Sequence, residues 1–240
     1  MSTGSPALPR DAAAAWGASA GGARTPRSPG HPLVRRLRPL ATSLFGAVLP
    51  LAVLTLAWGL SPGAEAWQLD LSRVWQEPWR LVTGHFVHWS DAHLRWDLAV
   101  FVGLGLACER HGRGRTAAAL ALAIPAVAFG APLLTPGLEV YRGLSGLDAA
   151  LFALLAAHRL YGSPKARILG AAALLGLGAK VGWEVATGVP LFVPELAADG
   201  VAVVPAAHLF GGAAGLLVGL LGRGRRPGDQ DSAGPPGSHQ

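Results

Sequence analysis

The chain has 240 residues, of which 51% are hydrophobic and 14% charged, with a formal net charge of +6. Long uncharged runs of Ala, Leu, Val and Gly are typical of membrane spans rather than of one or two soluble domains. The arginines form short clusters between apolar runs, without a basic stripe on an amphipathic face, which favours a membrane protein over a nucleic-acid-binding one. The single cysteine, Cys108, excludes an internal disulfide and is expected to be a buried structural thiol.

Both ends of the chain differ in composition from the middle. Residues 1–33 are rich in Ala, Gly, Ser, Pro and Arg with almost no periodicity, and residues 223–240 are rich in Gly, Pro and charge. Such segments cannot bury enough apolar surface to fold, so both are predicted to be disordered tails. Residues 34–222 remain as one ordered domain.

Apolar windows of about 17–25 residues predict six membrane spans in this domain. The expected fold is therefore an all-α membrane protein, a bundle of six transmembrane helices between disordered termini. In chain order the predicted spans are Leu40–Leu60, about Ala92–Cys108, Thr116 to about Leu134, Leu144–Leu160, about Ala166–Thr187 and about Pro205–Leu221.

The distribution of Lys and Arg sets the expected orientation of these spans. Basic clusters lie before span one, between spans two and three, between spans four and five, and after span six, whereas the opposite loops are poorer in Lys and Arg and richer in acidic residues. The positive-inside rule then places both termini in the cytoplasm. Spans two, four and six all enter from the outer side, so the polar residues at their starts share one depth: His93, Ser145 and His208.

Tryptophan is concentrated between the end of span one and the start of span two. Because tryptophan prefers the headgroup boundary, this outer segment is expected to lie partly in the membrane interface. Anchoring and the admission of substrate are both open roles for it. The six tryptophans are Trp58, Trp67, Trp75, Trp79, Trp89 and Trp96.

Spans four and six begin with the groups of a serine hydrolase. Ser145 stands in a Gly-Leu-Ser-Gly sequence, and His208 opens a helix that continues through Gly211 and Gly215. A hydroxyl and an imidazole at one membrane depth can form a nucleophile and its base, and small residues four apart let two helices approach closely. The alternative is that Ser145 is a helix N-cap and His208 a polar contact between helices.

Five motifs together resemble the rhomboid family of intramembrane serine proteases, over about residues 40–221. The best-matching branch is rhombosortase, which is associated with cleaving C-terminal Gly-Gly-type sorting anchors. The motifs are Arg80-Leu-Val-Thr-Gly-His85, His88-Trp-Ser-Asp-Ala-His93-Leu-Arg-Trp-Asp97, Gly105-x-x-x-Glu109, Gly143-x-Ser145-Gly146 and His208-x-x-Gly211-x-x-x-Gly215.

The resemblance implies a serine endopeptidase with a Ser145–His208 dyad and no metal or other cofactor. His208 would take the proton of Ser145 during attack on a peptide carbonyl and return it to the leaving amine. The implied substrates are membrane-anchored proteins cut near the outer leaflet, and the likeness to rhombosortase implies Gly-Gly C-terminal anchors. The implied location is a bacterial inner membrane, with the lipid bilayer as a partner and no nucleic acid.

The resemblance also suggests how an oxyanion would be bound. The Ser145 backbone N–H is one candidate donor, with Gly143 and Gly146 beside it, and His93 matches a family histidine that donates from span two. The family commonly has asparagine four residues later, where this chain has Asp97. We therefore expect Asp97 to orient His93 rather than donate, with a structural contact to a neighbouring helix as the alternative.

Asp148, Lys180 and Glu184 are further charged residues inside the predicted spans. Asp148 follows Ser145 by one turn and is expected to join a buried network rather than act as a third catalytic group. Lys180 and Glu184, four residues apart in span five, are expected to form a structural ion pair rather than take part in catalysis.

Two other functions remain open. A catalytically silent rhomboid-like binder of membrane spans would have the same fold, although this chain retains both the serine and the histidine. A membrane metal-dependent hydrolase or transporter could use His85, His88, His93 and Asp97, but their spacing does not place all four on one helix face. A soluble α/β-hydrolase is excluded because Ser145 follows a Pro-Gly loop and leads into continuous helix.

Overall fold

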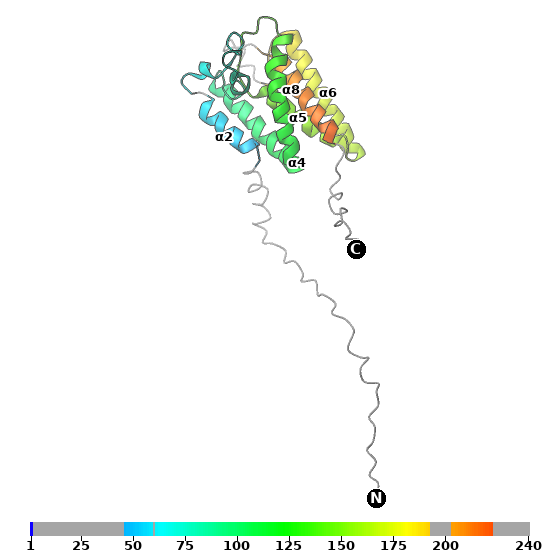
Figure 1. The fold of residues 1–240 in the computed structure, drawn as a ribbon. Coiled ribbons are helices and arrows are strands. Elements are labelled where there is room, and N and C mark those ends of the chain that lie inside the picture. The colour runs from blue at the N-terminus through cyan, green and yellow to red at the C-terminus, as the bar shows by residue number, and fades with distance from the viewer. Residues whose placement is uncertain (2–45, 60, 193–202, 223–240) are drawn as a thin grey trace, which may run out of the picture.

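The computed structural model describes residue 1 and residues 46–59, 61–192 and 203–222 (Figure 1). The predicted tails, 1–33 and 223–240, and the start of span one lie outside these residues. The described chain is mostly helical, as expected. Its elements are α2 (Val48–Trp58), the 3-10 helix η1 (Ala64–Ala66), β1 (Leu69–Asp70), α3 (Arg80–Thr83), α4 (Asp91–Leu134), β2 (Val140–Tyr141), α5 (Ser145–Arg159), α6 (Pro164–Thr187) and α8 (Pro205–Leu221).

Helix α4 contains predicted spans two and three in one element. Its backbone leaves the helical region at Gly112 (φ 160°, ψ 104°), so the element consists of two helical segments that meet there. By length and composition, α4 and α6 could each cross a membrane, and α2 and α8 are shorter apolar helices. The ends of α5, α6 and α8 lie within about two residues of the predicted spans.

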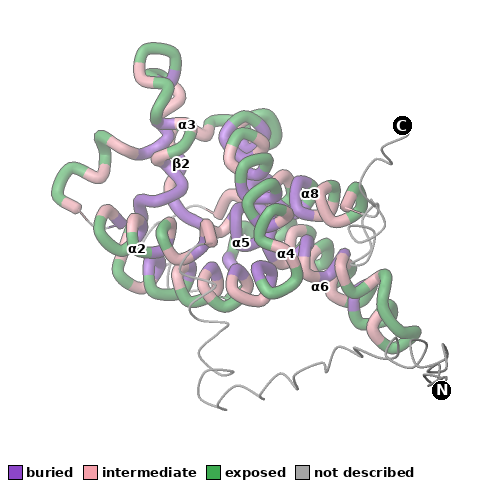
Figure 2. The backbone as a smooth tube through the Cα atoms, turned by 60° about the horizontal axis from the view of Figure 1, so that its bottom comes forward, coloured by how far each residue is buried: buried purple, intermediate pink, exposed green. Residues whose placement is uncertain are grey.

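Helix α5 is the centre of the bundle and packs against α4, α6 and α8, while α2 packs on the other side of α4 (Figure 1). The core contains two fully buried leucines of α5, Leu147 and Leu151, and Leu144 directly before the helix. Helix α6, by contrast, is described along its whole length and buries two residues, Gly170 and Glu184 (Figure 2).

Large apolar side chains cover the outside of the helices. A soluble monomer rarely exposes so much contiguous apolar surface, whereas a helix in lipid does so without cost. This surface therefore agrees with an integral membrane protein. Strongly exposed examples are Val53, Leu56, Leu133, Ile168, Leu169, Leu175, Val185 and Leu221.

Helices α5 and α8 approach so closely that glycine is required between them. A Cβ atom on Gly211 would run into the carbonyl group of Gly146, and one on Gly215 would run into the carbonyl group of Ala150. On the other side of this contact, a Cβ on Gly146 would lie 3.1 Å from the Ala207 carbonyl oxygen. Backbone thus packs against backbone along this interface, next to Ser145 and His208.

The segment before α5 is held by the outer loop between α2 and α4. Strands β1 and β2 pair antiparallel, with Leu69 opposite Tyr141, and the Gly143 N–H donates to the Gly84 carbonyl at 3.2 Å. Buried Arg80 keeps this loop in shape by donating to the carbonyl oxygens of residues 65 and 68. The loop therefore fixes the chain that leads directly into Ser145.

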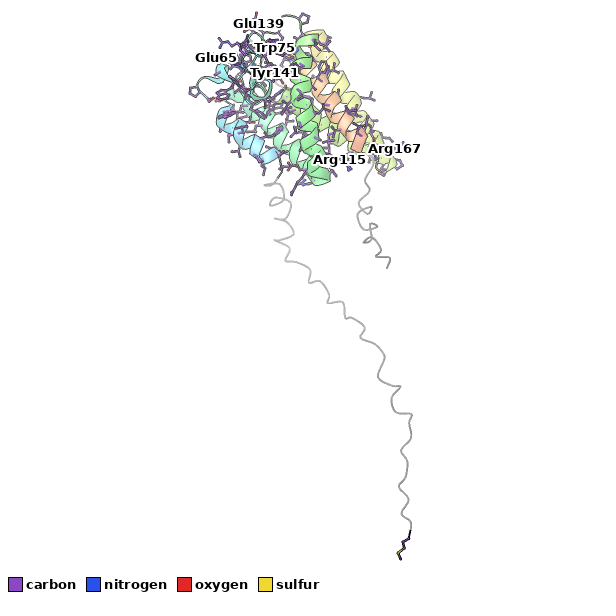
Figure 3. All side chains as sticks on the ribbon, viewed as in Figure 1. Glu65, Trp75, Arg115, Glu139, Tyr141 and Arg167 are labelled. Carbon is purple, nitrogen blue, oxygen red and sulfur yellow. The ribbon has the colours of Figure 1, made fainter. Side chains whose placement is uncertain are left out.

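The two ends of the bundle differ in charge. Arg115 and Arg167 lie at one end, whereas Glu65, Trp75, Glu139 and Tyr141 gather at the other (Figure 3). Ser145 follows Tyr141 by four residues and belongs to the second end.

Replacing Gly211 with alanine is expected to destabilise the bundle by about 1–3 kcal/mol, because the new methyl group must separate α5 from α8. Gly178→Ala is the matched control, since a Cβ there has nothing within 4 Å. We expect the control to be neutral or more stable by up to about 1 kcal/mol. Thermal unfolding of both variants in detergent measures the difference, and equal effects would contradict the close contact.

Candidate active site

Ser145 and His208 line one cavity of about 920 Å³. Four helices and the loop that precedes α5 form its walls, so residues far apart in the sequence meet here. The structure brings the predicted residues His93 and Asp97 from α4 to the same cavity as the serine and the histidine. Its apolar part includes Trp96, Val100, Leu104, Phe152, Ala173 and Leu177.

Ser145 is the first residue of α5, and Leu144 occupies the N-cap position without a side-chain cap. The alternative that Ser145 serves as an N-cap is therefore wrong. The Ser145 backbone N–H lies in the first turn, where helix N–H groups have no carbonyl partner within the helix. Its hydroxyl and its N–H are thus both placed at the positive end of α5.

Tyr141 is a site residue that sequence reasoning missed. Its hydroxyl donates to the Gly143 carbonyl at 3.1 Å and lies near the Ser145 side chain and the Gly146 N–H. Burial, reinforced by the charge of Asp97, raises the pKa of Tyr141, so the phenol stays neutral and can donate. Tyr141 is placed by the pairing of β2 with β1, in which it lies opposite Leu69. No sequence pattern predicts that pairing, so the sequence carried no signal for Tyr141.

Asp97 is the centre of a buried hydrogen-bond network. Its Oδ2 accepts the Leu144 backbone N–H at 2.9 Å and lies 3.2 Å from His93 Nε2 and 3.3 Å from His88 Nε2. The carboxylate therefore contacts His93, as expected, and also holds the peptide group that precedes Ser145. An ionised Asp97 carboxylate has no proton and cannot donate a hydrogen bond to an oxyanion.

Gly143 is required by the same arrangement. Its φ of +123° lies in a region that side chains rarely adopt, and a Cβ would lie 2.9 Å from His93 Cε1 and 3.2 Å from Asp97 Oδ2. The glycine lets the loop pass against the His93 ring on its way to Ser145.

His208 contacts α6 through its Nδ1 atom. Glu184 Oε2 lies 2.8 Å from Nδ1, and Lys180 Nζ lies 2.9 Å from the same atom. Lys180 also donates to both oxygens of Glu184, at 2.7 and 2.8 Å, so the predicted ion pair is confirmed. Within the described ranges, no hydrogen bond joins His208 directly to Ser145; the two share the cavity instead.

Asp148 lines the cavity one turn after Ser145. Its Oδ1 atom is buried without a hydrogen-bond partner among the described residues, so the expected participation in a buried network is not seen for this atom.

The buried histidines of the outer loop divide into two groups. Nε2 of His85 lies 3.2 Å from the Ile124 carbonyl, and burial lowers the pKa of His85 to about 4, so it is neutral at pH 7. His88, His93 and Asp97 instead bring three possible metal-ligating atoms within 4.8 Å of one another. The argument from spacing against a shared site is therefore wrong for these three, because the loop folds back onto α4.

A metal is not needed to explain this cluster. Burial lowers the pKa of His88, with the Asp97 contact opposing this effect, and a neutral imidazole can donate its Nε2 proton to the carboxylate. Asp97 Oδ2 is also occupied by the Leu144 N–H. The Leu144 N–H bond and the approach of the two imidazoles to the carboxylate fit a polar cluster without a metal, and the same set, with an N/N/O composition, could also hold a zinc ion.

The fold and this site together define a mostly helical membrane protein that presents a serine and a histidine, on adjacent helices, to one cavity. The Rhomboid domain model matches residues 75–225, which is more than half of the chain, so the protein belongs to the rhomboid family. This is a family of intramembrane proteases that act on membrane-protein substrates, although some members are inactive. No curated protein gives a significant sequence match to the chain.

Asp97→Asn is expected to lower the free energy of unfolding by about 1.5–3 kcal/mol, because the carboxylate accepts buried donors from three residues. Asp91→Asn, an exposed substitution in the first turn of the same helix, should cost less than about 1 kcal/mol. Thermal unfolding in detergent compares them. If Asp97→Asn costs no more than Asp91→Asn, the charge of Asp97 does not hold the loop.

Proposed function

We propose that the protein is an intramembrane serine endopeptidase in which Ser145 is the nucleophile and His208 the general base. The observation that carries this proposal is the shared cavity of Ser145 and His208, on helices whose backbones touch through Gly211 and Gly146. Catalytic hydrogen bonds are often long in the absence of substrate and tighten when it binds, so the lack of a direct bond in the described chain is compatible with this role.

The proposed reaction begins with attack of Ser145 Oγ on the carbonyl carbon of the scissile peptide bond. The hydroxyl proton moves to His208 Nε2 as the C–O bond forms. Collapse of the tetrahedral intermediate breaks the C–N bond, and the same proton passes to the leaving amine. Water then attacks the acyl-enzyme, with His208 taking its proton and returning it to Ser145.

The Ser145 backbone N–H is the oxyanion donor that the geometry supports best. It belongs to the first turn of α5, where the positive end of the helix dipole stabilises a negative charge. His93 lines the same cavity and is oriented by the contact of its Nε2 with Asp97; it is a second donor when both of its ring nitrogens carry a proton. In this proposal Asp97 replaces the family's usual asparagine donor by positioning the histidine and the Leu144 peptide group.

The proposal includes six membrane spans, with the two segments of α4 counted separately and both termini cytoplasmic, in a bacterial inner membrane. Support comes from the charge asymmetry, because Arg115 and Arg167 lie at the end of the bundle away from Tyr141 (Figure 3). Exposed tryptophans of the outer loop, such as Trp75, suit the headgroup region near the site. Cleavage would then take place near the outer leaflet.

The wild-type protein, purified in detergent, is expected to react covalently with a fluorophosphonate probe at Ser145. Ser145→Ala should abolish labelling, and His208→Ala should lower its rate by about 10²–10⁴-fold, because the general base is lost. Ser72→Ala is the matched control and should be labelled as wild type, since Ser72 is exposed and lies outside the cavity. Gel fluorescence with mass spectrometry of the labelled peptide measures the result.

Folded wild-type protein that is not labelled, or is labelled equally in Ser145→Ala, would contradict the proposal and favour the silent binder of membrane spans. The cluster of His88, His93 and Asp97 favours a metal-dependent hydrolase as the second candidate. Loss of labelling and of cleavage on treatment with a chelator, with recovery on adding zinc, would support that candidate instead.

For the substrate, we propose a C-terminal anchor that contains a Gly-Gly sequence, as in rhombosortases. A peptide bond in a helix is shielded and already hydrogen-bonded, so the substrate must unwind before Ser145 can attack. Glycine costs a helix about 1 kcal/mol per residue relative to alanine, which makes a Gly-Gly segment easy to unwind.

Co-expression with a protein carrying a Gly-Gly C-terminal anchor is expected to release that protein from the membrane when the enzyme is wild type. Ser145→Ala should leave it anchored, and replacing the substrate Gly-Gly by Leu-Leu should slow release, because the helix no longer unwinds readily. Fractionation and mass spectrometry of the released C-terminus measure both effects. Equal release of the Leu-Leu substrate would contradict the anchor proposal but leave the protease proposal intact.

A further inference from the structure

We infer that Glu184 is a positioning residue for His208 and that the site works as a Ser145–His208–Glu184 triad rather than a dyad. This inference rests on the proposed function and names an additional residue for it. Glu184 was expected only to pair with Lys180 on its own helix, whereas the structure adds a contact of 2.8 Å between its Oε2 and His208 Nδ1.

The burial of Glu184 is the first reason to assign it a role beyond that pair. Its side chain is 2% exposed, although α6 is otherwise the most exposed of the long helices and buries just one other residue, Gly170. A buried carboxylate within a membrane helix is costly unless it is paired. An ion pair between Lys180 and Glu184 alone does not require contact with α8, yet both side chains contact Nδ1 of His208.

Two groups approach Nδ1 of His208: the Glu184 carboxylate at 2.8 Å and the Lys180 ammonium at 2.9 Å. Lys180 already donates to both Glu184 oxygens, whereas an unprotonated Nδ1 would set its lone pair against the carboxylate, so we assign Nδ1 as the donor to Glu184. That tautomer leaves Nε2 with a free lone pair, which is the atom that must accept the Ser145 proton. Glu184 thus selects the tautomer that can act as a base.

Lys180 sets the strength of this effect. Its ammonium group donates to both Glu184 oxygens and lies 2.9 Å from His208 Nδ1 and 3.4 Å from Nε2. The lysine therefore holds the carboxylate in place and, as a positive charge, opposes the imidazolium that forms during catalysis. Glu184 compensates for that repulsion, since opposite charges within about 4–6 Å favour each other.

The Nδ1 proton of His208, which is donated in the hydrogen bond to Glu184, is not transferred. When Ser145 Oγ bonds to the substrate carbonyl carbon, its proton goes to Nε2, and Nδ1 keeps its own proton throughout. The resulting imidazolium has two N–H groups: Nε2–H faces the substrate, and Nδ1–H donates to Glu184. The other ionisable groups that line the cavity are all retained in the variants below: Asp148 on α5, His93 and Asp97 on α4, and Glu139, Tyr141 and Arg142 on the segment before α5.

The first test compares Glu184→Gln with Lys180→Met in the full-length protein. Glu184→Gln should lower kcat for cleavage of a membrane-anchored substrate by about 10²–10⁴-fold, with a smaller change in KM. It should also shift the acidic limb of the pH–rate profile by about one unit to lower pH, because the imidazolium loses its counter-charge. Lys180→Met should shift that limb in the opposite direction, because the carboxylate then acts without compensation.

Glu65→Gln is the matched control, because it removes an exposed carboxylate outside the cavity and should leave rate and profile unchanged. If Glu184→Gln does not fold because Lys180 is left unpaired, the double variant Lys180→Met/Glu184→Gln removes both charges and should still show the loss in kcat. A wild-type rate in the double variant, or loss of activity in Lys180→Met with an unchanged Glu184→Gln, would overturn the triad.

The second test does not depend on proteolytic activity. Histidine-selective ¹⁵N labelling reports directly which ring nitrogen is protonated, and His208→Ala identifies the signal. In wild type at neutral pH we expect protonated Nδ1 at His208, and in Glu184→Gln a mixture of both tautomers. Protonated Nε2 in wild type would overturn the inference, whereas failure of Ser145 labelling alone would overturn the proposed function.

Discussion

The close approach of α8 to α5 is the contact on which the site depends. Gly211 and Gly215 stand against the carbonyl groups of Gly146 and Ala150, so the two helix axes are separated by backbone atoms alone. In a bilayer no hydrophobic effect drives helices together, and association relies on such packing and on polar contacts. One added methyl group here would move His208 relative to Ser145, although neither residue would itself be changed.

A second constraint acts on the loop before α5, and its centre is Asp97. One carboxylate oxygen receives the Leu144 N–H and contacts His88 and His93, which come from the outer loop and the start of α4. These contacts converge on the peptide group next to Ser145, while Nδ1 of both histidines is buried without a hydrogen-bond partner among the described residues. The loop between α2 and α4 therefore contributes to the position of Ser145.

Local sequence patterns predicted the helices and the ion pair of Lys180 with Glu184. They did not predict the contacts between different elements. Apolar windows placed α5, α6 and α8 closely, and the i,i+4 spacing of Lys180 and Glu184 predicted their ion pair. Contacts of Asp97 with Leu144, and of Glu184 with His208, join residues 47 and 24 positions apart. No periodicity encodes them, because they depend on how far α6 and the outer loop turn toward the cavity.

The contact between Glu184 and His208 links the chemistry of the site to the docking of one helix. Helix α6 buries little apart from Glu184 and Gly170, so packing alone fixes it less firmly than it fixes α5. The polar cluster of Lys180, Glu184 and His208 is then a substantial part of what holds α6 against α8. A displacement of α6 from the bundle would remove the carboxylate from Nδ1 of His208. In the proposed mechanism the same contact orients the base, so the proposed reactivity of Ser145 depends on the packing of α6 against α8.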